Sequence, residues 1–337
     1  MKVAIVHDDL VQWGGAERIL EGICELYPDA PIFTSVIDRD NKEIKKRFGS
    51  KKIITSFLQK IPGWKSLYKI LLPFYPIAFE QFSFDEFDLV ISHTTRFAKG
   101  IITKPKTKHI SYIHTPPRFL WHLSEGKNYG FLELLMSKLR IYDVISSNRP
   151  DHIIAGSENA KKRIKKIYRR DSKLVYPFID LKRFEDVASF EGGYFLVIAR
   201  NSGYKKVDLA KEACLKIGAE LKVISGGLDD HMVVQTLAGC KALVIPGIED
   251  FGLSSLEAQA LGKSVVAYKA GGALETVIDG KTGIFFTEQN VNSLAEALQR
   301  ISSKKINSEE CIANANKFSK ENFLNWFKQT VDSLVYT

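Results

Sequence analysis

The stretch VIPGIEDFGLSSLEAQALG, residues 244–262, has the pattern of a strand, a loop and a helix. It continues an apolar run that begins at Ala242, and a short apolar run bounded by turn residues is typical of a buried strand. A Pro-Gly pair ends that run, and we expect a helix that begins near Ser254 and ends at Gly262. This unit predicts an α/β fold in which the loop lies at the carboxyl end of a parallel strand.

The loop inside this stretch carries residues suited to a phosphorylated ligand. Gly252 has no Cβ, so the backbone there can approach a ligand closely. The helix start that follows offers unpaired N–H groups and the positive end of a dipole, which favour a phosphate. Glu249 lies in the loop and Glu257 about one turn into the helix, on either side of such a ligand. The arrangement predicts a nucleotide-sugar site; the alternative is an ordinary strand–loop–helix with two solvated acids.

The pattern Glu249-x7-Glu257, followed by Ala258-x-Ala260-x-Gly262, resembles the signature of family 4 retaining glycosyltransferases, which have the GT-B fold. A second glycine-rich run, GGALETVIDGKTG at 271–283, strengthens the resemblance. It implies that the first Glu lies against the transferred sugar, that the second holds the ribose hydroxyls, and that backbone amides hold the distal phosphate. The donor-binding residues that it implies in this region are Phe251, Gly252, Leu253, Ser254 and Glu257.

The chain opens with a similar unit. We expect a strand over residues 3–7, a glycine-rich loop, and a helix over residues 16–26. The loop is not G-x-G-x-x-G, so it lacks the dinucleotide fingerprint, but Gly14 and Gly15 bring backbone amides to the end of the first strand. The family resemblance implies a glycine pair near the sugar and phosphate in an acceptor-facing domain; the alternative is a tight turn that needs small residues.

A third candidate site follows an expected strand over residues 108–113. The segment YIHTPPRFLW, residues 112–121, resembles one in a mannosyltransferase-like subgroup of family 4. There the histidine contacts the donor sugar, which implies this role for His114, and Arg118 can hold an acceptor phosphate. Without the resemblance, a lone histidine is more often structural.

A cationic pair follows the strand expected at 194–199. Arg200 and Lys205 lie at the carboxyl end of this strand, where a diphosphate leaving group needs positive charge, since no metal-ligand cluster is evident. They resemble the Arg/Lys diphosphate pair of the family; the alternative is a basic loop. Two departures from the family are visible, a basic Lys206 where many members have Gly, and a shortened region at 226–242 that puts the base preference in doubt.

Composition sets the class of protein and its surroundings. A chain of 337 residues with 45% hydrophobic residues predicts about two globular domains. No apolar run is long enough to span a membrane, the first strand begins at once without a signal peptide, and the four cysteines form no C-x-x-C pair. We therefore expect a cytoplasmic protein, peripheral on the inner membrane face where its charge allows, without a zinc site, disulfides or another bound metal or cofactor.

The basic excess belongs to the first half. Residues 1–180 hold 30 Lys and Arg against 20 Asp and Glu, a net charge of +10, whereas the remainder has a net charge of −1. An aromatic-rich segment at 56–84 with Lys60, Lys65 and Lys69 indicates core packing for most of its aromatics and contact with anionic lipid for its basic rim. A helix with basic residues over 161–170 also favours an anionic surface, with nucleic acid as the second choice and a solvated face as the ordinary one.

These observations predict a GT-B fold of two doubly wound α/β domains. The N-terminal acceptor-side domain spans 1–182 and the donor domain 190–318, and a last helix at 319–337 packs back on the first domain. The function expected is metal-independent, retaining transfer of a hexose from a nucleotide sugar, GDP-mannose or a UDP-sugar, to a glycan or lipid-linked acceptor. The alternatives are a nucleotide-sugar epimerase, a non-catalytic nucleotide-sugar-binding scaffold and, for the basic helix, a nucleic-acid binder, which we do not expect. Neither the acceptor nor the linkage nor the oligomeric state follows from the sequence.

Overall fold

The fold was analysed in a computed structural model that describes residues 1–67, 70–123, 130–199, 203–226, 228–304 and 306–335. The chain divides into two compact units, each made of a parallel sheet between helices. Unit 1 comprises Met1–Tyr176 together with Leu324–Thr337, and unit 2 comprises Pro177–Phe323. No described helix combines the length and the apolar character that a membrane crossing requires.

Unit 1 is built on a seven-stranded parallel sheet with the order β3-β2-β1-β4-β5-β6-β7. The chain moves outward from β1 in one direction and then returns to the other side of β1, which is the doubly wound topology. The strands are β1 (Val3–His7), β2 (Ile32–Thr34), β3 (Ile53–Thr55), β4 (Leu89–Thr94), β5 (Lys108–Ile113), β6 (His152–Ala155) and β7 (Lys173–Leu174). The helices are α1 (Gly15–Leu26), α2 (Lys42–Phe48), α3 (Trp64–Leu67), α4 (Tyr75–Glu80), α5 (Glu133–Ser146), α6 (Glu158–Tyr168) and most of α13 (Lys320–Val335).

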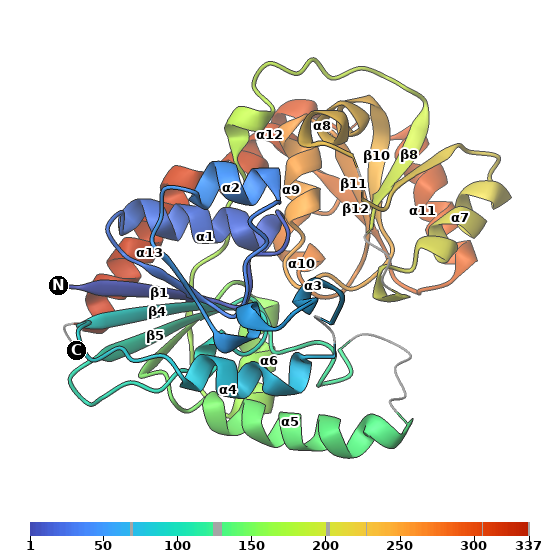
Figure 1. The fold of residues 1–337 in the computed structure, drawn as a ribbon. Coiled ribbons are helices and arrows are strands. Elements are labelled where there is room, and N and C mark those ends of the chain that lie inside the picture. Colours follow the sequence, from blue (N-terminus) through green and yellow to red (C-terminus); the bar gives the residue numbers. More distant parts are fainter. Residues whose placement is uncertain (68–69, 124–129, 200–202, 227, 305, 336–337) are drawn as a thin grey trace. The chain divides into compact units, whose positions relative to one another are not determined.

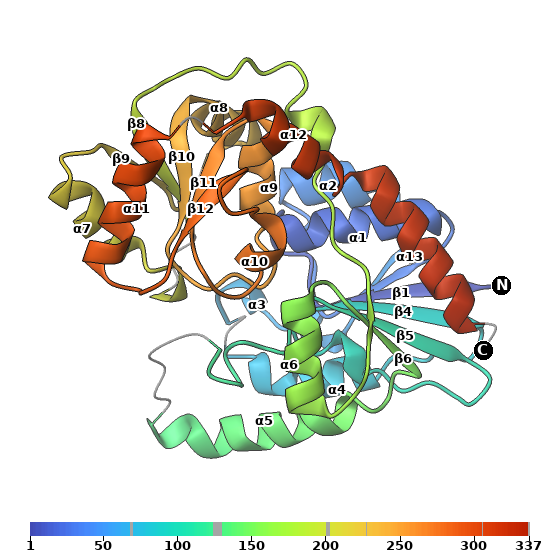
Figure 2. The same ribbon diagram turned by 180° about the vertical axis from the view of Figure 1, so that it is seen from behind.

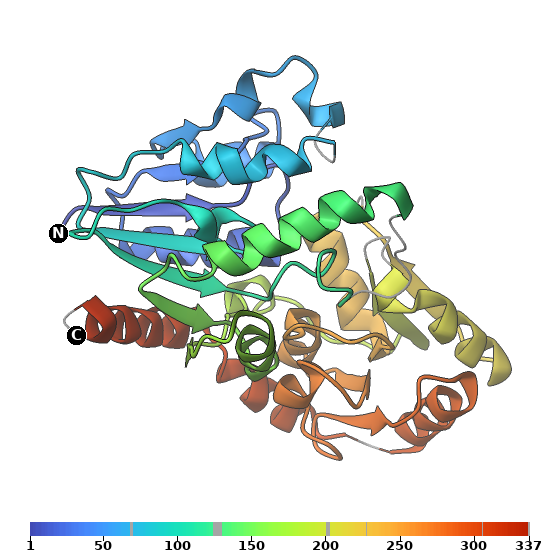
Figure 3. The ribbon, with the colours of Figure 1, turned by 90° about the horizontal axis from the view of Figure 1, so that it is seen from below.

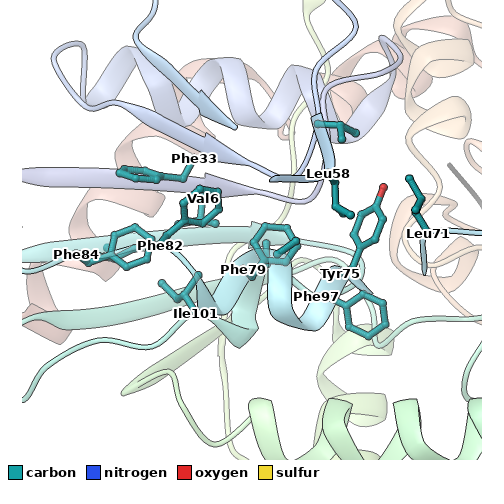
Figure 4. Close-up of a cluster of buried hydrophobic side chains, with 14 of the residues drawn as sticks. Val6, Phe33, Leu58, Leu71, Tyr75, Phe79, Phe82, Phe84, Phe97 and Ile101 are labelled. Atoms are coloured by element: carbon teal, nitrogen blue, oxygen red, sulfur yellow. The ribbon is translucent and has the colours of Figure 1, made fainter. Parts of the chain in front are cut away.

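The two faces of this sheet are covered by different helices. Helices α1 and α13 lie on one face, and α4 and α5 on the other (Figure 1 and Figure 2). Seen from below in Figure 3, α4 in cyan and α5 in green lie in front of the strands. Most of the aromatic residues expected in the core are found there, because Tyr75, Phe79, Phe82 and Phe84 form one buried cluster with Phe33 of β2 (Figure 4), whereas Phe57 and Phe74 are exposed.

The basic rim of residues 60–69 is only partly available for lipid. Lys65 lies 2.6 Å from Asp38 and 2.7 Å from Asp40, so two carboxylates of the same unit already neutralise it. Lys69 lies outside the described residues. Lys60 is exposed at the end of a short 3₁₀ helix, and its role stays a prediction.

Unit 2 is built on a five-stranded parallel sheet with the order β12-β11-β10-β8-β9. Its apolar strands are buried because helices α7 and α11 pack on one face and α8, α9 and α10 on the other. The strands are β8 (Tyr194–Ile198), β9 (Leu221–Ile224), β10 (Cys240–Ile245), β11 (Ser264–Tyr268) and β12 (Gly283–Phe286). The helices are α7 (Val207–Lys216), α8 (Asp230–Gly239), α9 (Leu253–Ala260), α10 (Ala273–Thr276), α11 (Val291–Ser303) and α12 (Ser308–Asn316). The prediction of two doubly wound parallel α/β domains is confirmed.

Candidate active site

The loop between β10 and α9 forms the centre of the candidate site in unit 2. Gly252 is the N-cap residue of α9 and has φ 102°, a left-handed conformation that side chains disfavour. Because glycine has no side chain, no side-chain cap is found at this helix start in the described part of unit 2. The first-turn amides of α9 are thus presented at the end of the loop, with Leu253 and Ser254 half-buried.

Two further glycines hold this loop in position. The amide of Gly272 donates a 2.9 Å hydrogen bond to the carbonyl oxygen of Glu249. A Cβ at Gly272 would lie 2.3 Å from the Cα of Phe251, and one at Gly247 would lie 2.0 Å from the carbonyl oxygen of Tyr204. Only glycine fits these positions without a backbone shift, so the glycine-rich run after α9 packs directly on the Glu249 loop.

Glu249 and Lys205 form an ion pair inside unit 2. Lys205 Nζ donates a short hydrogen bond to Glu249 Oε1, and both side chains are largely buried. Lys205 comes from the segment after β8 and Glu249 from the loop after β10, and these strands are neighbours in the sheet. The sheet therefore brings one predicted cation beside one predicted carboxylate, at the edge where doubly wound sheets bind ligands.

The second predicted carboxylate has an unpredicted partner. Arg183 Nη1 donates a 2.5 Å hydrogen bond to Glu257 Oε1, while its Nη2 and Nε donate to the two oxygens of Asp230 at 2.5 and 2.7 Å. Burial alone would lower the pKa of Arg183, but the Glu257 and Asp230 carboxylates outweigh this and raise the pKa. The guanidinium is therefore a fixed positive charge that orients Glu257 from one side.

The buried side of α9 is held by polar contacts. Ser255 Oγ donates to Thr276 Oγ1 at 2.7 Å, and Gln259 Nε2 donates to the Thr276 carbonyl oxygen at 2.8 Å. Asn314 from α12 donates to Gln259 at 2.8 Å. Phe251 is buried and packs edge-on against Phe318. These contacts fix the helix whose start and first turn carry the predicted donor-binding residues.

The remaining predicted donor residue, Arg200, lies outside the described residues. Lys206, which departs from the family pattern, adopts a left-handed conformation with φ 47° as the N-cap of α7. Its Nζ donates a 2.9 Å hydrogen bond to Gln289. A glycine would adopt this conformation without strain.

The predicted acceptor-side residues Gly14, Gly15 and Arg118 lie in unit 1, as does His114, which was predicted to contact the donor sugar. Gly14 is the N-cap of α1, in extended conformation, and Gly15 is the first residue of that helix. His114 directly follows β5, is half-buried, and its Nε2 lies 2.7 Å from Nε2 of His93. Arg118 is half-buried in the turn after the Pro-Pro pair, where its carbonyl oxygen accepts from Leu123 at 3.1 Å.

Sequence reasoning missed Arg183 and the histidine beside His114. Arg183 fell between the two expected domains, 1–182 and 190–318, and a lone arginine there gives no signal for a partner 74 positions away. Within the described residues, no group of three or more His, Cys, Asp or Glu side chains is arranged to hold a metal ion.

Two family models match the chain. Residues 13–183 match the model described as Glycosyltransferase Family 4, and residues 181–318 match Glycosyl transferases group 1. Alpha-1,3/1,6-mannosyltransferase ALG2 of Dictyostelium discoideum is 31% identical over 149 residues, 43% of this chain and 35% of that protein. An uncharacterized glycosyltransferase of Methanocaldococcus jannaschii is 24% identical over 212 residues, 55% of this chain and 59% of its own length. These matches thus span between about a third and three fifths of the curated relatives.

Solved structures share the fold over nearly the whole chain. Sucrose-phosphate synthase from Thermosynechococcus elongatus superposes with a TM-score of 0.76 at 15% identity, covering 99% of both chains. Anabaena HepE, solved in complex with UDP and glucose, superposes with a TM-score of 0.70 at 17% identity, covering 99% of this chain and 100% of that one. The fold is therefore GT-B. Since the first family model covers just over half of the 337 residues, this chain belongs to Glycosyltransferase Family 4.

Proposed function

We propose that the protein is a retaining glycosyltransferase that moves a hexose from a nucleotide sugar to a glycan or lipid-linked acceptor. The observation that carries the proposal is the pairing of Lys205 with Glu249 beside the glycine-capped start of α9. A cation, a carboxylate and a set of helix amides at one sheet edge supply what a sugar diphosphate requires. Membership of family 4 supports the transferase reading over the epimerase and the scaffold.

We assign binding of the donor and stabilisation of the leaving group to different residues of the site. Lys205, with Arg200, and the amides at the start of α9 would stabilise negative charge on the departing diphosphate. Glu257, oriented by Arg183, would accept hydrogen bonds from the ribose hydroxyls. Glu249 would orient the sugar and support the positive charge that develops at its reacting carbon. By family resemblance, the leaving phosphate takes the acceptor proton, and no metal ion is needed.

Mannose from GDP-mannose is the first donor to test. The support is the similarity to ALG2, named as a mannosyltransferase, and the resemblance of the His114 segment to a mannosyltransferase-like subgroup. UDP-sugars form the second group, because HepE, which shares the fold, was solved with UDP-glucose. The region 226–242, shortened relative to the family pattern, is the one that would decide between them.

The test is a panel of GDP- and UDP-sugars scored for hydrolysis and for transfer to a lipid-linked sugar, with and without EDTA. One donor should be consumed, EDTA should not reduce the rate, and Glu257→Ala should lower kcat/KM by about 100-fold, from the loss of charge-assisted hydrogen bonds. Glu296→Ala on α11, an exposed carboxylate on the other face of the sheet, is the matched control and should leave the rate unchanged. An unchanged kcat/KM in Glu257→Ala would refute the site, and nucleotide binding without turnover of any donor would favour the scaffold.

We further propose that unit 1 meets an anionic membrane where a lipid-linked acceptor is presented. The support is the set of exposed basic residues on and after α6, Lys162, Lys166 and Arg169, whereas Lys165 is paired with Asp171 at 2.7 Å. Other basic residues here are engaged within unit 1, since Arg170 donates to the carbonyl oxygens of Ser147 and Pro150. In a flotation assay, the protein should float with phosphatidylglycerol vesicles at low salt and dissociate from them as the salt concentration rises. Neutral vesicles should not bind it.

A further inference from the structure

Three histidines lie side by side at the carboxyl ends of adjacent strands in unit 1. The central strands run in the order β1-β4-β5 (Figure 1). His7 is paired in register with His93, and His93 is paired with Tyr112, two residues before His114. Because paired residues of parallel strands point to the same face, the sheet places these imidazoles in one row. No sequence pattern marks this row, since each strand contributes a single residue.

The row is in hydrogen-bond contact and ends at a carboxylate. His7 Nδ1 lies 2.9 Å from His93 Nδ1 and 3.1 Å from the carbonyl oxygen of His93. At the other side of the ring, His93 Nε2 lies 2.7 Å from His114 Nε2. His7 Nε2 lies 3.9 Å from Oε1 of Glu17, which comes from α1. His7, His93 and Glu17 are at most 4% exposed, so water does not compete for these contacts.

The carbonyl oxygen of His93 determines which ring nitrogen of each histidine carries the hydrogen. A carbonyl oxygen only accepts, so His7 Nδ1 must carry a hydrogen to use the oxygen of His93. Two N–H groups facing each other at 2.9 Å would repel, so Nδ1 of His93 carries no hydrogen. A neutral His93 then carries its hydrogen on Nε2 and donates it to Nε2 of His114. His114 is left with its hydrogen on Nδ1.

We infer that Glu17, His7 and His93 are positioning residues that hold His114 neutral, in the tautomer with hydrogen on Nδ1. Protonating His114 on Nε2 would place two N–H groups against each other at 2.7 Å. Relieving that contact would require His93 to reverse its tautomer, with its hydrogen on Nδ1 and not on Nε2. That hydrogen would then face the Nδ1–H group of His7. The Glu17 carboxylate, by favouring a charged His7, opposes this reversal.

The charges around the row act in the same direction. Burial lowers the pKa of His7, but Glu17, Asp8 and Asp9 outweigh burial and raise the pKa. Burial also lowers the pKa of His93, and its neighbours His114 and His7 lower it further. His7 thus favours the charged form while His93 stays neutral.

The other groups packed on the row do not reverse this. Arg96 is paired with Asp9, and Asp8 accepts hydrogen bonds from the backbone amides of residues 95–98. Tyr112 stacks on His93, and burial raises the pKa of its hydroxyl, so it adds no charge. A Cβ at Gly156 would lie 3.6 Å from Nδ1 of His114, so the glycine leaves room beside this nitrogen.

A consequence for ligands rests on the proposed function. A neutral Nδ1–H donor suits an uncharged acceptor such as a sugar hydroxyl, whereas an imidazolium would suit a phosphate. The row would therefore suit His114 to a sugar hydroxyl and not to a phosphate. The tautomer itself does not depend on that function.

The test is long-range ¹H–¹⁵N NMR of the protein labelled at its seven histidines, with the His114 signals assigned by a His114→Gln variant. At pH 7 the wild type should show His114 neutral with a protonated Nδ1, and it should remain so well below pH 6.5, the ordinary histidine pKa. Glu17→Gln should raise the pH at which His114 gains its proton by about one unit, because His7 then loses its positive charge and no longer holds the tautomer of His93.

The matched control is Glu21→Gln, which removes the same charge from the same helix at a residue paired with Arg47. It should leave the His114 spectrum unchanged. A wild-type spectrum with hydrogen on Nε2, or with an imidazolium at pH 7, would overturn the inference even if Glu17→Gln failed to fold. If the tautomer is found but His114→Gln turns over GDP-mannose at the wild-type rate, the inference stands and the role of His114 in the proposed function fails.

Discussion

Replacing Arg183 by Met would expose how far Glu257 depends on its unpredicted partner. The Arg183 side chain is 9% exposed, and it holds a Glu257 that is 19% exposed and an Asp230 that is 49% exposed. Removing one member of a buried ion pair costs about 3–5 kcal/mol, because a charge is left buried without a partner. Asp230 reaches water on its own, so its share is small. We therefore expect the free energy of unfolding to fall by about 2–3 kcal/mol, chiefly from Glu257.

The assay is urea unfolding of the wild type, Arg183→Met, Glu257→Gln and the double variant, with binding of GDP measured by calorimetry on the same proteins. Glu257→Gln should cost less than Arg183→Met, because Arg183 keeps both hydrogen bonds to Asp230. The two changes should not add, with a coupling of about 1–2 kcal/mol between the contacting residues. GDP affinity should fall about tenfold in Arg183→Met, since a displaced Glu257 no longer meets the ribose in one orientation.

Two results would refute this reasoning. If Arg183→Met unfolds at the wild-type urea concentration with the same slope, the guanidinium does not compensate buried charge. If the two substitutions are additive, Arg183 and Glu257 act independently, and the hydrogen bond between them does not position the carboxylate.

Three further predictions concern buried groups. Lys99→Met removes the cation beside the fully buried Asp143, which keeps only the hydrogen bonds from Trp121 and Tyr168. It should lower the free energy of unfolding by about 3–5 kcal/mol in a urea titration, and a loss below about 1 kcal/mol would contradict the pairing. The pKa of His7 is raised in the folded protein, so its pairing with Glu17 stabilises the fold fully at a pH below the pKa of His7 in the unfolded chain, and this stabilisation is lost as the pH rises through its pKa in the folded protein. Glu17→Gln should therefore lower the melting temperature more at pH 6 than at pH 9. An equal loss at both pH values would count against the pair. Burial raises the thiol pKa of all four cysteines, Cys24, Cys214, Cys240 and Cys311. Iodoacetamide at pH 7.5 should therefore leave the native protein unlabelled and label it fully in urea, as measured by mass spectrometry.

The elements that the sequence predicts well are those whose causes are local. The β10 strand, the glycine turn at Gly252 and the helix that follows lie within about twenty consecutive residues, and each has its own signal in apolar run, turn residue or helix start. The pattern therefore placed Glu249 and Glu257 on a loop and a helix before their surroundings were known.

The contacts that the sequence does not predict join distant segments. Arg183 meets Glu257 across 74 positions, and His7 meets His93 across 86. Neither histidine has a neighbour in sequence that signals a site, and each lies in a strand that reads as ordinary apolar core. Their meeting is decided by strand order and register, which follow from the packing of the whole sheet and from no single stretch.

The last helix, α13, has a consequence for how the chain folds during synthesis. Unit 1 draws its final segment from residues 324–337, after all of unit 2 has been made. Phe327, Val331 and Leu334 of that segment are buried, and the Phe327 ring lies 5.8 Å from that of Tyr112. Nascent chains fold from the N-terminus as they leave the ribosome. The first unit to emerge therefore keeps an uncovered apolar face until the sixteen-residue helix α13 is released, so a chain truncated before residue 320 should destabilise its first unit more than its second.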